Sequence, residues 1–191
     1  MFKTQNLTLR AWRDIDIKSF RNMMQDLEVM EFIPQEYMIC GDAASNIKLF
    51  NEHLNQFGYT IFACELKESG EFVGCAGALQ RSVDEQNTIK ETIISFYMSR
   101  AYWGLGLAIE AIQKCFEIIF QDSCIDSVVG YTSTLNLRSQ KVMQKLGMKK
   151  VQNITLLHPK LPPDHRLAPH VKYCISRGEY RINLLELHQP L

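Results

Sequence analysis

Two glycines, Gly104 and Gly106, stand between a predicted strand over residues 92–99 and a predicted amphipathic helix. The helix begins near Ala108, because apolar side chains recur on one helical face at residues 108, 111, 112, 115, 116 and 119. A helix N-terminus presents unpaired N–H groups and a partial positive charge, and glycine lets an anion approach the backbone closely. The segment predicts a pyrophosphate-binding turn, and a plain tight turn before a helix is the alternative.

Two other phosphate-binding motifs can be compared with this turn. A dinucleotide-binding turn needs a third small residue, in the pattern Gly-x-Gly-x-x-Gly/Ala, but Ile109 occupies that place. A triphosphate-binding loop needs Gly-Lys-Ser/Thr, which does not follow Gly106. Nicotinamide cofactors and nucleoside triphosphates are therefore disfavoured as ligands.

The order of the other predicted elements favours a mixed α/β sheet over a doubly wound one. Alternating apolar residues predict strands over 7–12, 59–66, 72–79, 127–132, 151–157 and 171–176. Helical spacing predicts helices over 14–27 (with Asp14 as its N-cap), 42–56, 136–147 and 180–187. Residues 159–169 hold four of the six prolines and predict an irregular loop. We expect a single domain over residues 1–191.

Composition narrows the classes of partner and compartment. The net charge is zero, with 21 basic and 21 acidic residues, so we expect neither nucleic acid nor a membrane surface as a partner. The six cysteines include no Cys-x-x-Cys pair, and we expect free thiols and no metal. The first residues lack the apolar core of a signal peptide, and no stretch approaches about 20 apolar residues. These features predict a cytoplasmic protein.

A second motif opens the helix after the strand at 127–132. Asn136 is a suitable N-cap, Ser139 lies in the first turn, and Gly147 suits a left-handed C-cap. Together with the glycine turn, this motif resembles the GNAT N-acetyltransferases, in particular the branch typified by the ribosomal-protein N-terminal acetyltransferases RimJ and RimL. The resemblance rests on segments 7–16, 70–77, 101–111, 136–139 with 145–148, and 170–173 with 176–180.

The resemblance implies a fold and a cosubstrate. The fold would be a central mixed, mostly antiparallel sheet with splayed middle strands, flanked by helices, and the cosubstrate would be acetyl-CoA. The pantetheine would pair with the backbone of Phe96, Tyr97 and Met98, and Asn136 and Ser139 would face the thioester. The pyrophosphate would lie on N–H groups of Trp103, Gly104, Leu105, Gly106, Leu107 and Ala108.

Acetyl transfer to an amine needs a proton acceptor for the amine, a donor to the oxyanion and stabilisation of the leaving thiolate. Many family members use a tyrosine as the acid, but Met143 stands at that place. In the ribosomal branch a serine at the position of Ser139 serves instead, so the resemblance implies Ser139 as the candidate acid. Ile93 stands where the family often has an acidic residue. Glu91 lies on the same strand face and is the candidate base, and His170 and His158 are alternatives because histidine titrates near neutral pH.

The predicted function is transfer of an acetyl group to a primary amine, either a protein N-terminal α-amino group or a small-molecule amine, in a ternary complex. The alternative is an acyl-CoA-binding sensor or interaction module with little catalysis, which Ile93 and Met143 would suit. The first two helices and the loop at 159–169 would form the acceptor pocket, with residues 34–38 lining it. The resemblance also leaves a homodimer open.

Overall fold

The structure, a computed structural model, describes residues 1–33, 42–83, 86, 88–152 and 156–187. Among these residues, nine strands form a sheet in the order β1-β2-β3-β4-β5-β6-β9-β7, with β8 paired to β9. The pairs β1–β2, β2–β3, β3–β4, β6–β9, β7–β9 and β8–β9 are antiparallel, and β5–β6 is parallel. This arrangement confirms the predicted mixed, mostly antiparallel sheet.

The chain divides into two compact units, one of residues 1–79 and 94–118 and the other of residues 80–93 and 119–191. Each unit is discontinuous in sequence, and the chain passes between them along β4, β5 and α3. The single domain over 1–191 stays a prediction. No helix among the described residues is long and apolar enough to cross a bilayer.

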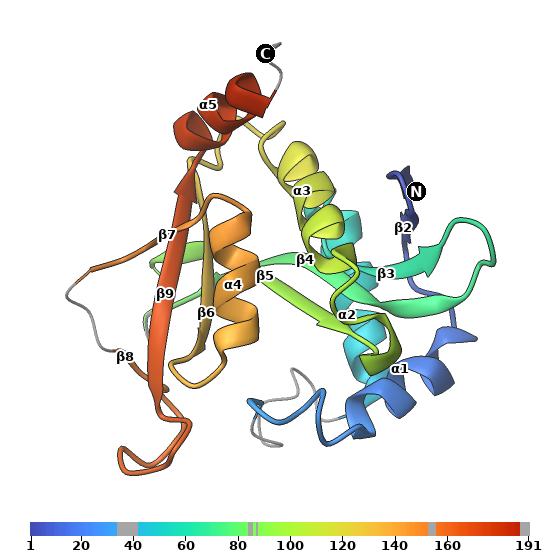
Figure 1. The fold of residues 1–191 in the computed structure, drawn as a ribbon, viewed down its shortest axis with the longest axis horizontal. Helices are drawn as coiled ribbons and strands as arrows, with labels where there is room; N and C mark the ends of the chain where they lie inside the picture. The colour runs from blue at the N-terminus through green and yellow to red at the C-terminus, as the bar shows by residue number, and fades with distance from the viewer. Residues whose placement is uncertain (34–41, 84–85, 87, 153–155, 188–191) are drawn as a thin grey trace. The chain divides into compact units, whose positions relative to one another are not determined.

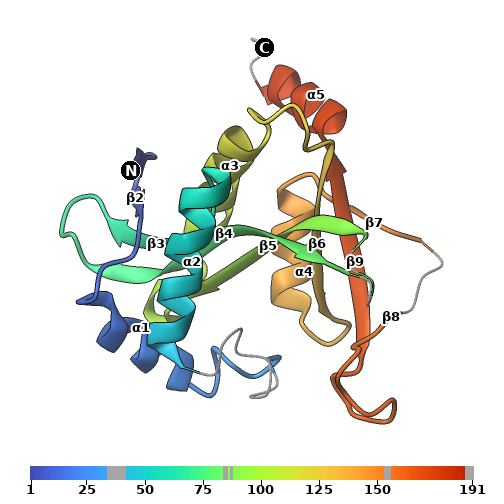
Figure 2. The same cartoon turned by 180° about the vertical axis from the view of Figure 1, so that it is seen from behind.

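The first unit combines an antiparallel sheet with helices on both of its faces. Figure 1 shows α3 in front of β3 and β4, and Figure 2 shows α2 in front of them from the opposite side. Its elements are β1 (Phe2–Lys3), β2 (Leu7–Arg10), α1 (Asp16–Gln25), α2 (Ala43–Phe57), β3 (Ile61–Leu66), most of β4 (Phe72–Ser82), the end of β5 (Lys90–Met98), the 3-10 turn η2 (Arg100–Tyr102) and α3 (Leu107–Ile119).

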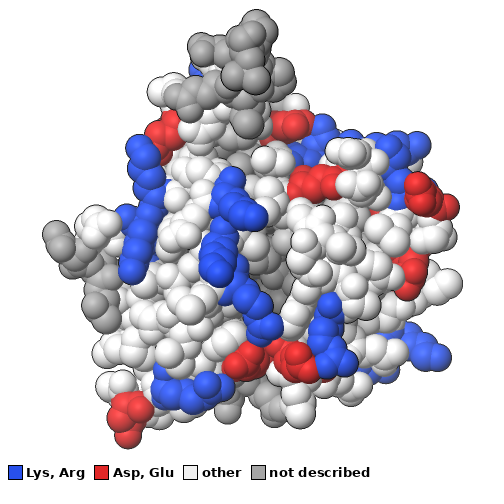
Figure 3. All heavy atoms as spheres, in the orientation of Figure 1, with Lys and Arg blue, Asp and Glu red and all other residues white. Residues whose placement is uncertain are grey.

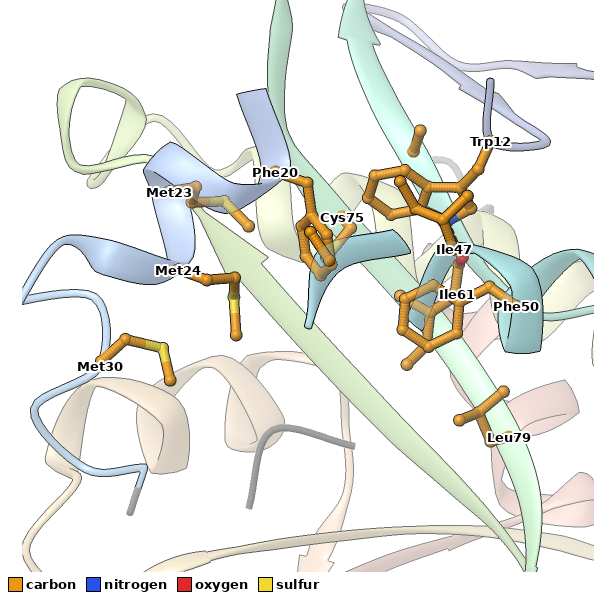
Figure 4. Close-up of a cluster of buried hydrophobic side chains, with 12 residues drawn as sticks. Trp12, Phe20, Met23, Met24, Met30, Ile47, Phe50, Ile61, Cys75 and Leu79 are labelled. Carbon is orange, nitrogen blue, oxygen red and sulfur yellow. Dashed lines mark hydrogen bonds between the residues drawn. The ribbon is translucent and has the colours of Figure 1, made fainter. Parts of the chain in front are cut away.

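An aromatic cluster forms the core of the first unit (Figure 4). The ring of Trp12 lies 4.8 Å from that of Phe20 and 5.8 Å from that of Phe50, measured between centroids. The indole N–H of Trp12 donates to the carbonyl of Ile61 at 2.7 Å, so this buried ring has a partner for its only polar atom. The cluster therefore joins α1 and α2 to β3.

A buried ion-pair network holds the start of α1. The Arg10 guanidinium donates to both carboxylate oxygens of Asp16, at 2.6 and 2.8 Å, and also to Glu65. Asp16 in addition accepts the backbone N–H of Arg13 at 2.8 Å. The prediction of Asp14 as N-cap is wrong: α1 begins after Ile15 without a side-chain cap, and the N–H groups of Asp16 and Ile17 donate to the backbone carbonyls of Arg13 and Asp14, at 2.9 and 3.2 Å.

The second unit contains the start of β5, β6 (Ser127–Ser133), α4 (Leu137–Lys145), β7 (Lys149–Lys150), β8 (Leu156–Leu157), β9 (Pro169–Ser176) and α5 (Arg177–Leu187). β6 and β9 pair over seven consecutive positions, and α4 lies on one face of these strands (Figure 1). β5 and β6 pair at one position, Ile93 with Val129. The predicted splay of the middle strands beyond that position stays a prediction.

Two predicted boundaries in this unit differ from the structure. Of the strand predicted over 151–157, the structure has β8 at its end, whereas β7 ends before it at Lys150, and residues 153–155 lie outside the described part of the chain. The last helix begins at Arg177 rather than at 180. Ser176 and Glu179 form a reciprocal capping box, in which the Glu179 carboxylate accepts the Ser176 N–H at 2.9 Å and the Ser176 hydroxyl accepts the Glu179 N–H at 3.2 Å.

Candidate functional site

The turn between β5 and α3 belongs wholly to the first unit. The indole N–H of Trp103 donates to the carbonyl of Met98 at 2.7 Å, which fastens the turn to the end of β5. Gly104 and Gly106 have φ angles of 80° and 78°, in the left-handed region that favours glycine. A Cβ built on either glycine would meet nothing within 4 Å, so the backbone there is open to a ligand.

Unpaired N–H groups gather where α3 begins. The Glu110 N–H makes the first helical bond, to the carbonyl of Gly106 at 3.1 Å, so the preceding N–H groups have no partner inside the helix. The Trp103 N–H is different, because it donates to the carbonyl of Arg100 at 3.1 Å. The donors that fit a pyrophosphate are therefore those from Gly104 to Ala108.

The acidic residue in the first turn of α3 is held by the N-terminal segment. Glu110 accepts the hydroxyl of Thr4, and the backbone and side-chain N–H groups of Asn6 at 2.6 and 2.8 Å. Burial opposes ionisation, but these hydrogen bonds outweigh it and hold the pKa of Glu110 below its ordinary value. Its negative charge is thus bound by Thr4 and Asn6.

The end of β5 lies directly before this turn. Phe96 and Tyr97 are half-buried and Met98 is buried. β4 approaches this segment closely, since a Cβ on Gly74 would stand 2.3 Å from the carbonyl oxygen of Tyr97. The structure places these three residues and the glycine turn on consecutive segments of one unit, and pairing of their backbone with pantetheine stays a prediction.

The Asn136 motif lies in the second unit. The Asn136 side-chain oxygen accepts the backbone N–H of Ser139 at 3.0 Å, so Asn136 is the N-cap of α4 as predicted. Ser139 is half-buried and Met143 is fully buried. Exposed basic residues follow on the same helix, and Figure 3 shows Lys and Arg gathered where α4 lies. These residues are Arg138, Lys141 and Lys145.

Glu91 lies in a network that spans three strands of the second unit. One of its oxygens accepts the Tyr131 hydroxyl at 2.5 Å and the other accepts the Lys172 ammonium at 2.5 Å. Burial lowers the pKa of Lys172, but its hydrogen bonds with Glu91 and Tyr131 outweigh burial and raise this pKa above its ordinary value. Burial, together with the hydrogen bond to Glu91, raises the pKa of Tyr131. Lys172 is therefore a cation that neutralises Glu91. No pattern in the sequence indicates this network, because its members come from three different strands, β5, β6 and β9.

The histidines named as alternative bases lie close to each other. The rings of His158 and His170 meet edge to face, with centroids 5.0 Å apart. Both belong to the second unit, as do Glu91, Asn136 and Ser139. Residues 34–38, the predicted lining of the acceptor pocket, lie outside the described residues.

Comparisons with known proteins agree with the fold. An acetyltransferase from Agrobacterium tumefaciens has a TM-score of 0.70 at 20% identity, covering 92% of this chain and 94% of that one. Spermidine N-acetyltransferase from Vibrio cholerae, solved with CoA and spermine, has a TM-score of 0.69 at 15% identity, covering 92% of this chain and 98% of that one. The fold is that of the acetyltransferases.

Residues 6–149 match the family described as the acetyltransferase (GNAT) domain. YkkB, an uncharacterized protein of Bacillus subtilis, is 27% identical over 149 residues, which cover 76% of this chain and 83% of that protein. The chain belongs to the GNAT acetyltransferase family. It is an acetyl-CoA-dependent N-acetyltransferase that acts on amines.

Proposed function

We propose that the chain transfers the acetyl group of acetyl-CoA directly to a primary amine bound in the same complex. The observation that carries the cofactor site is the pair of left-handed glycines before the free N–H groups of α3. An anion at that place gains both hydrogen bonds and the field of the helix dipole. Bound there, acetyl-CoA would supply the thioester that the acceptor amine attacks.

In this proposal Asn136 and Ser139 face the thioester, and Ser139 protonates the departing thiolate. Its place in the first turn of α4, with Met143 buried behind it, supports this role because Met143 has no proton to give. The amine needs a base, since an α-amino group is partly protonated at pH 7. Glu91 is the candidate predicted from the sequence, with His170 and His158 as alternatives.

The acceptor is proposed as a protein N-terminal α-amino group, as in the RimJ and RimL branch, or as a small-molecule amine. The spermidine enzyme with a similar fold supports the second kind of acceptor. A panel of N-terminal peptides and polyamines, each assayed for CoA release, distinguishes the two classes. Release of CoA with peptides alone would assign the protein N-terminus.

Substitution of Gly104 by valine tests the cofactor site. Valine must adopt a φ of about 80° there, and its side chain would stand where the phosphates are proposed to lie. We expect Gly104→Val to weaken acetyl-CoA binding by at least about a hundredfold, or about 2.7 kcal/mol, in calorimetry.

Gly70→Val is the matched control. Gly70 has a φ of 70°, has no atom within 4 Å of a built Cβ, and lies in the β3–β4 turn of the same unit. Both variants should lose similar stability, of about 1–3 kcal/mol, from backbone strain. Unchanged acetyl-CoA affinity in Gly104→Val, or an equal loss in Gly70→Val, would contradict the assignment of the turn.

The second candidate function is an acyl-CoA sensor with little turnover. The ion pair between Glu91 and Lys172 favours it, because the candidate base is already bound to a cation of its own unit. Micromolar binding of acetyl-CoA without CoA release, across the whole amine panel, would identify this function.

A further inference from the structure

Two histidines of the second unit lie beside the segment that leads into α4. His170 pairs with Ser133 at the end of β6, and the next residue, Thr134, donates its N–H to the carbonyl of Pro169 at 2.9 Å. His158 follows β8, which pairs with the same end of β9. This end of β9 therefore reaches the start of the helix that carries the proposed acid.

The hydrogen bonds of the two rings define their tautomers. The Nδ1 atom of His170 lies 3.0 Å from the carbonyl oxygen of Ala168, and a carbonyl only accepts, so Nδ1 carries the hydrogen. The lone pair of neutral His170 is therefore on Nε2. In His158, Nδ1 accepts the Lys160 N–H at 3.4 Å, so its lone pair is already engaged. In His170, therefore, the basic nitrogen Nε2 is not the atom that bonds to the backbone, whereas in His158 the basic nitrogen Nδ1 is.

Both rings favour the neutral form. Burial lowers the pKa of His170 despite the opposing bond to Ala168. Burial, followed by the charges of His170 and Lys160, lowers the pKa of His158. A histidine with a lowered pKa is deprotonated at neutral pH and can accept a proton.

The other titratable groups on the neighbouring strands form hydrogen bonds and an ion pair with one another. Lys172 lies two residues along β9, and its ammonium binds Glu91, which also accepts the Tyr131 hydroxyl. Both oxygens of Glu91 are thus engaged, one by the Lys172 ammonium and the other by the Tyr131 hydroxyl.

The faces of β9 separate the two proton-transfer roles. The Tyr173 hydroxyl accepts a hydrogen bond from Gln144 of α4 at 3.2 Å, so Tyr173 faces the helix that carries Ser139. Side chains alternate along a strand, so His170 faces the other way.

We infer that Nε2 of His170 is the base that takes the proton from the acceptor amine, and that Glu91 positions Lys172 and Tyr131. This inference rests on the proposed function. The ammonium gives one proton to Nε2, and the amine nitrogen then forms the C–N bond with the thioester carbon. The nitrogen of the tetrahedral intermediate, which is positively charged, releases its second proton to water. The C–S bond then breaks with its electron pair on sulfur, and the thiolate is protonated by Ser139, which is reprotonated from water. His170 releases its proton to water.

The pH dependence of kcat tests the inference, because at saturating substrate it follows groups in the ternary complex. The wild type should lose activity as pH falls through the lowered pKa of His170. His170→Gln should lower kcat at pH 7 by about a hundredfold or more and remove this acidic limb, with acetyl-CoA affinity in calorimetry unchanged. Added imidazole should restore activity to His170→Ala in proportion to its neutral form, which a structural role would not produce.

His165→Gln is the matched control, because His165 is exposed in the loop that precedes β9 and its Nδ1 accepts the Leu167 N–H at 3.2 Å. It should keep the wild-type profile, and Glu91→Gln should keep the acidic limb. Loss of that limb in Glu91→Gln, or wild-type kcat in His170→Gln, would overturn the inference alone. If the wild type binds acetyl-CoA but acetylates no amine, the proposed function fails and the inference fails with it.

Discussion

The ion pair between Arg10 and Asp16 offers a sharp test of the packing of the first unit. Both side chains are 5% exposed, and two hydrogen bonds of 2.6 and 2.8 Å join them. Asp16→Asn keeps the shape of the side chain but leaves the guanidinium with Glu65 as its remaining anionic partner. Breaking a buried pair by removing one charge costs about 3–5 kcal/mol, and Glu65 should keep the loss near 3.

Urea unfolding at pH 7 measures this change. With a slope of about 2–3 kcal/mol per molar urea, the midpoint of Asp16→Asn should fall by about 1–1.5 M. Asp14→Asn is the control, because it removes the same charge two residues earlier at an exposed position. Its midpoint should stay within about 0.2 M of the wild type, which corresponds to about 0.5 kcal/mol.

The same pair predicts the pH dependence. Burial opposes ionisation of Asp16, but the hydrogen bonds from Arg10 and Arg13 outweigh it and hold its pKa below the ordinary value. The stability it contributes is therefore complete above the unfolded pKa, about 3.9, and is lost as pH falls through the lower folded pKa. The gap between wild type and Asp16→Asn should narrow only in that acidic range. Equal midpoints for Asp14→Asn and Asp16→Asn at pH 7 would refute the reasoning.

Two further perturbations address the close approach of strands and the N-terminal segment. In Gly77→Ala the new Cβ would stand 1.8 Å from the carbonyl oxygen of Thr60, so thermal unfolding should show a severe loss, whereas Gly178→Ala, within helix α5, should gain about 0.5–1 kcal/mol. Equal melting temperatures would contradict the strand packing. Glu110→Gln should raise the hydrogen-exchange rate of the Asn6 backbone N–H by about tenfold at neutral pH. Because the pKa of Glu110 is lowered, that protection in the wild type should disappear only in acid, and unchanged exchange in the variant would reject the contact.

The helices show how far local patterns reach. The apolar stripe predicted for α3 is buried at Ala111, Ile112, Cys115, Phe116 and Ile119, because a period of 3.6 residues places them on one face whatever the neighbours are. The start of α5 was missed although Ser176 and Glu179 stand three residues apart, which is the spacing of a capping box. The capping-box spacing is present in the sequence, but β9 ends at Ser176 and α5 begins at the next residue, so no turn residues separate the strand from the helix.

The N-cap of α1 illustrates the opposite case. The sequence predicts Asp14 as the cap, but α1 begins after Ile15 without a side-chain cap, and Asp16 is its first residue. Arg10 reaches Asp16 from β2, and Glu65 completes the network from β3. These long-range ion pairs hold the start of the helix, and the spacing of residues along the chain does not indicate them.

The sequence by itself determined the local elements of this protein: the glycine turn before α3, the Asn136 cap of α4 and the order of most strands. These depend on periodicity and on hydrogen bonds within a few residues, so they can be read along the chain. Only the tertiary structure decided which ionisable groups meet. Glu91 meets Tyr131 and Lys172 across 40 and 81 residues of chain, and His170 meets His158 through β8 and β9. The register of paired strands sets those contacts, and with them the charge and tautomer of each group.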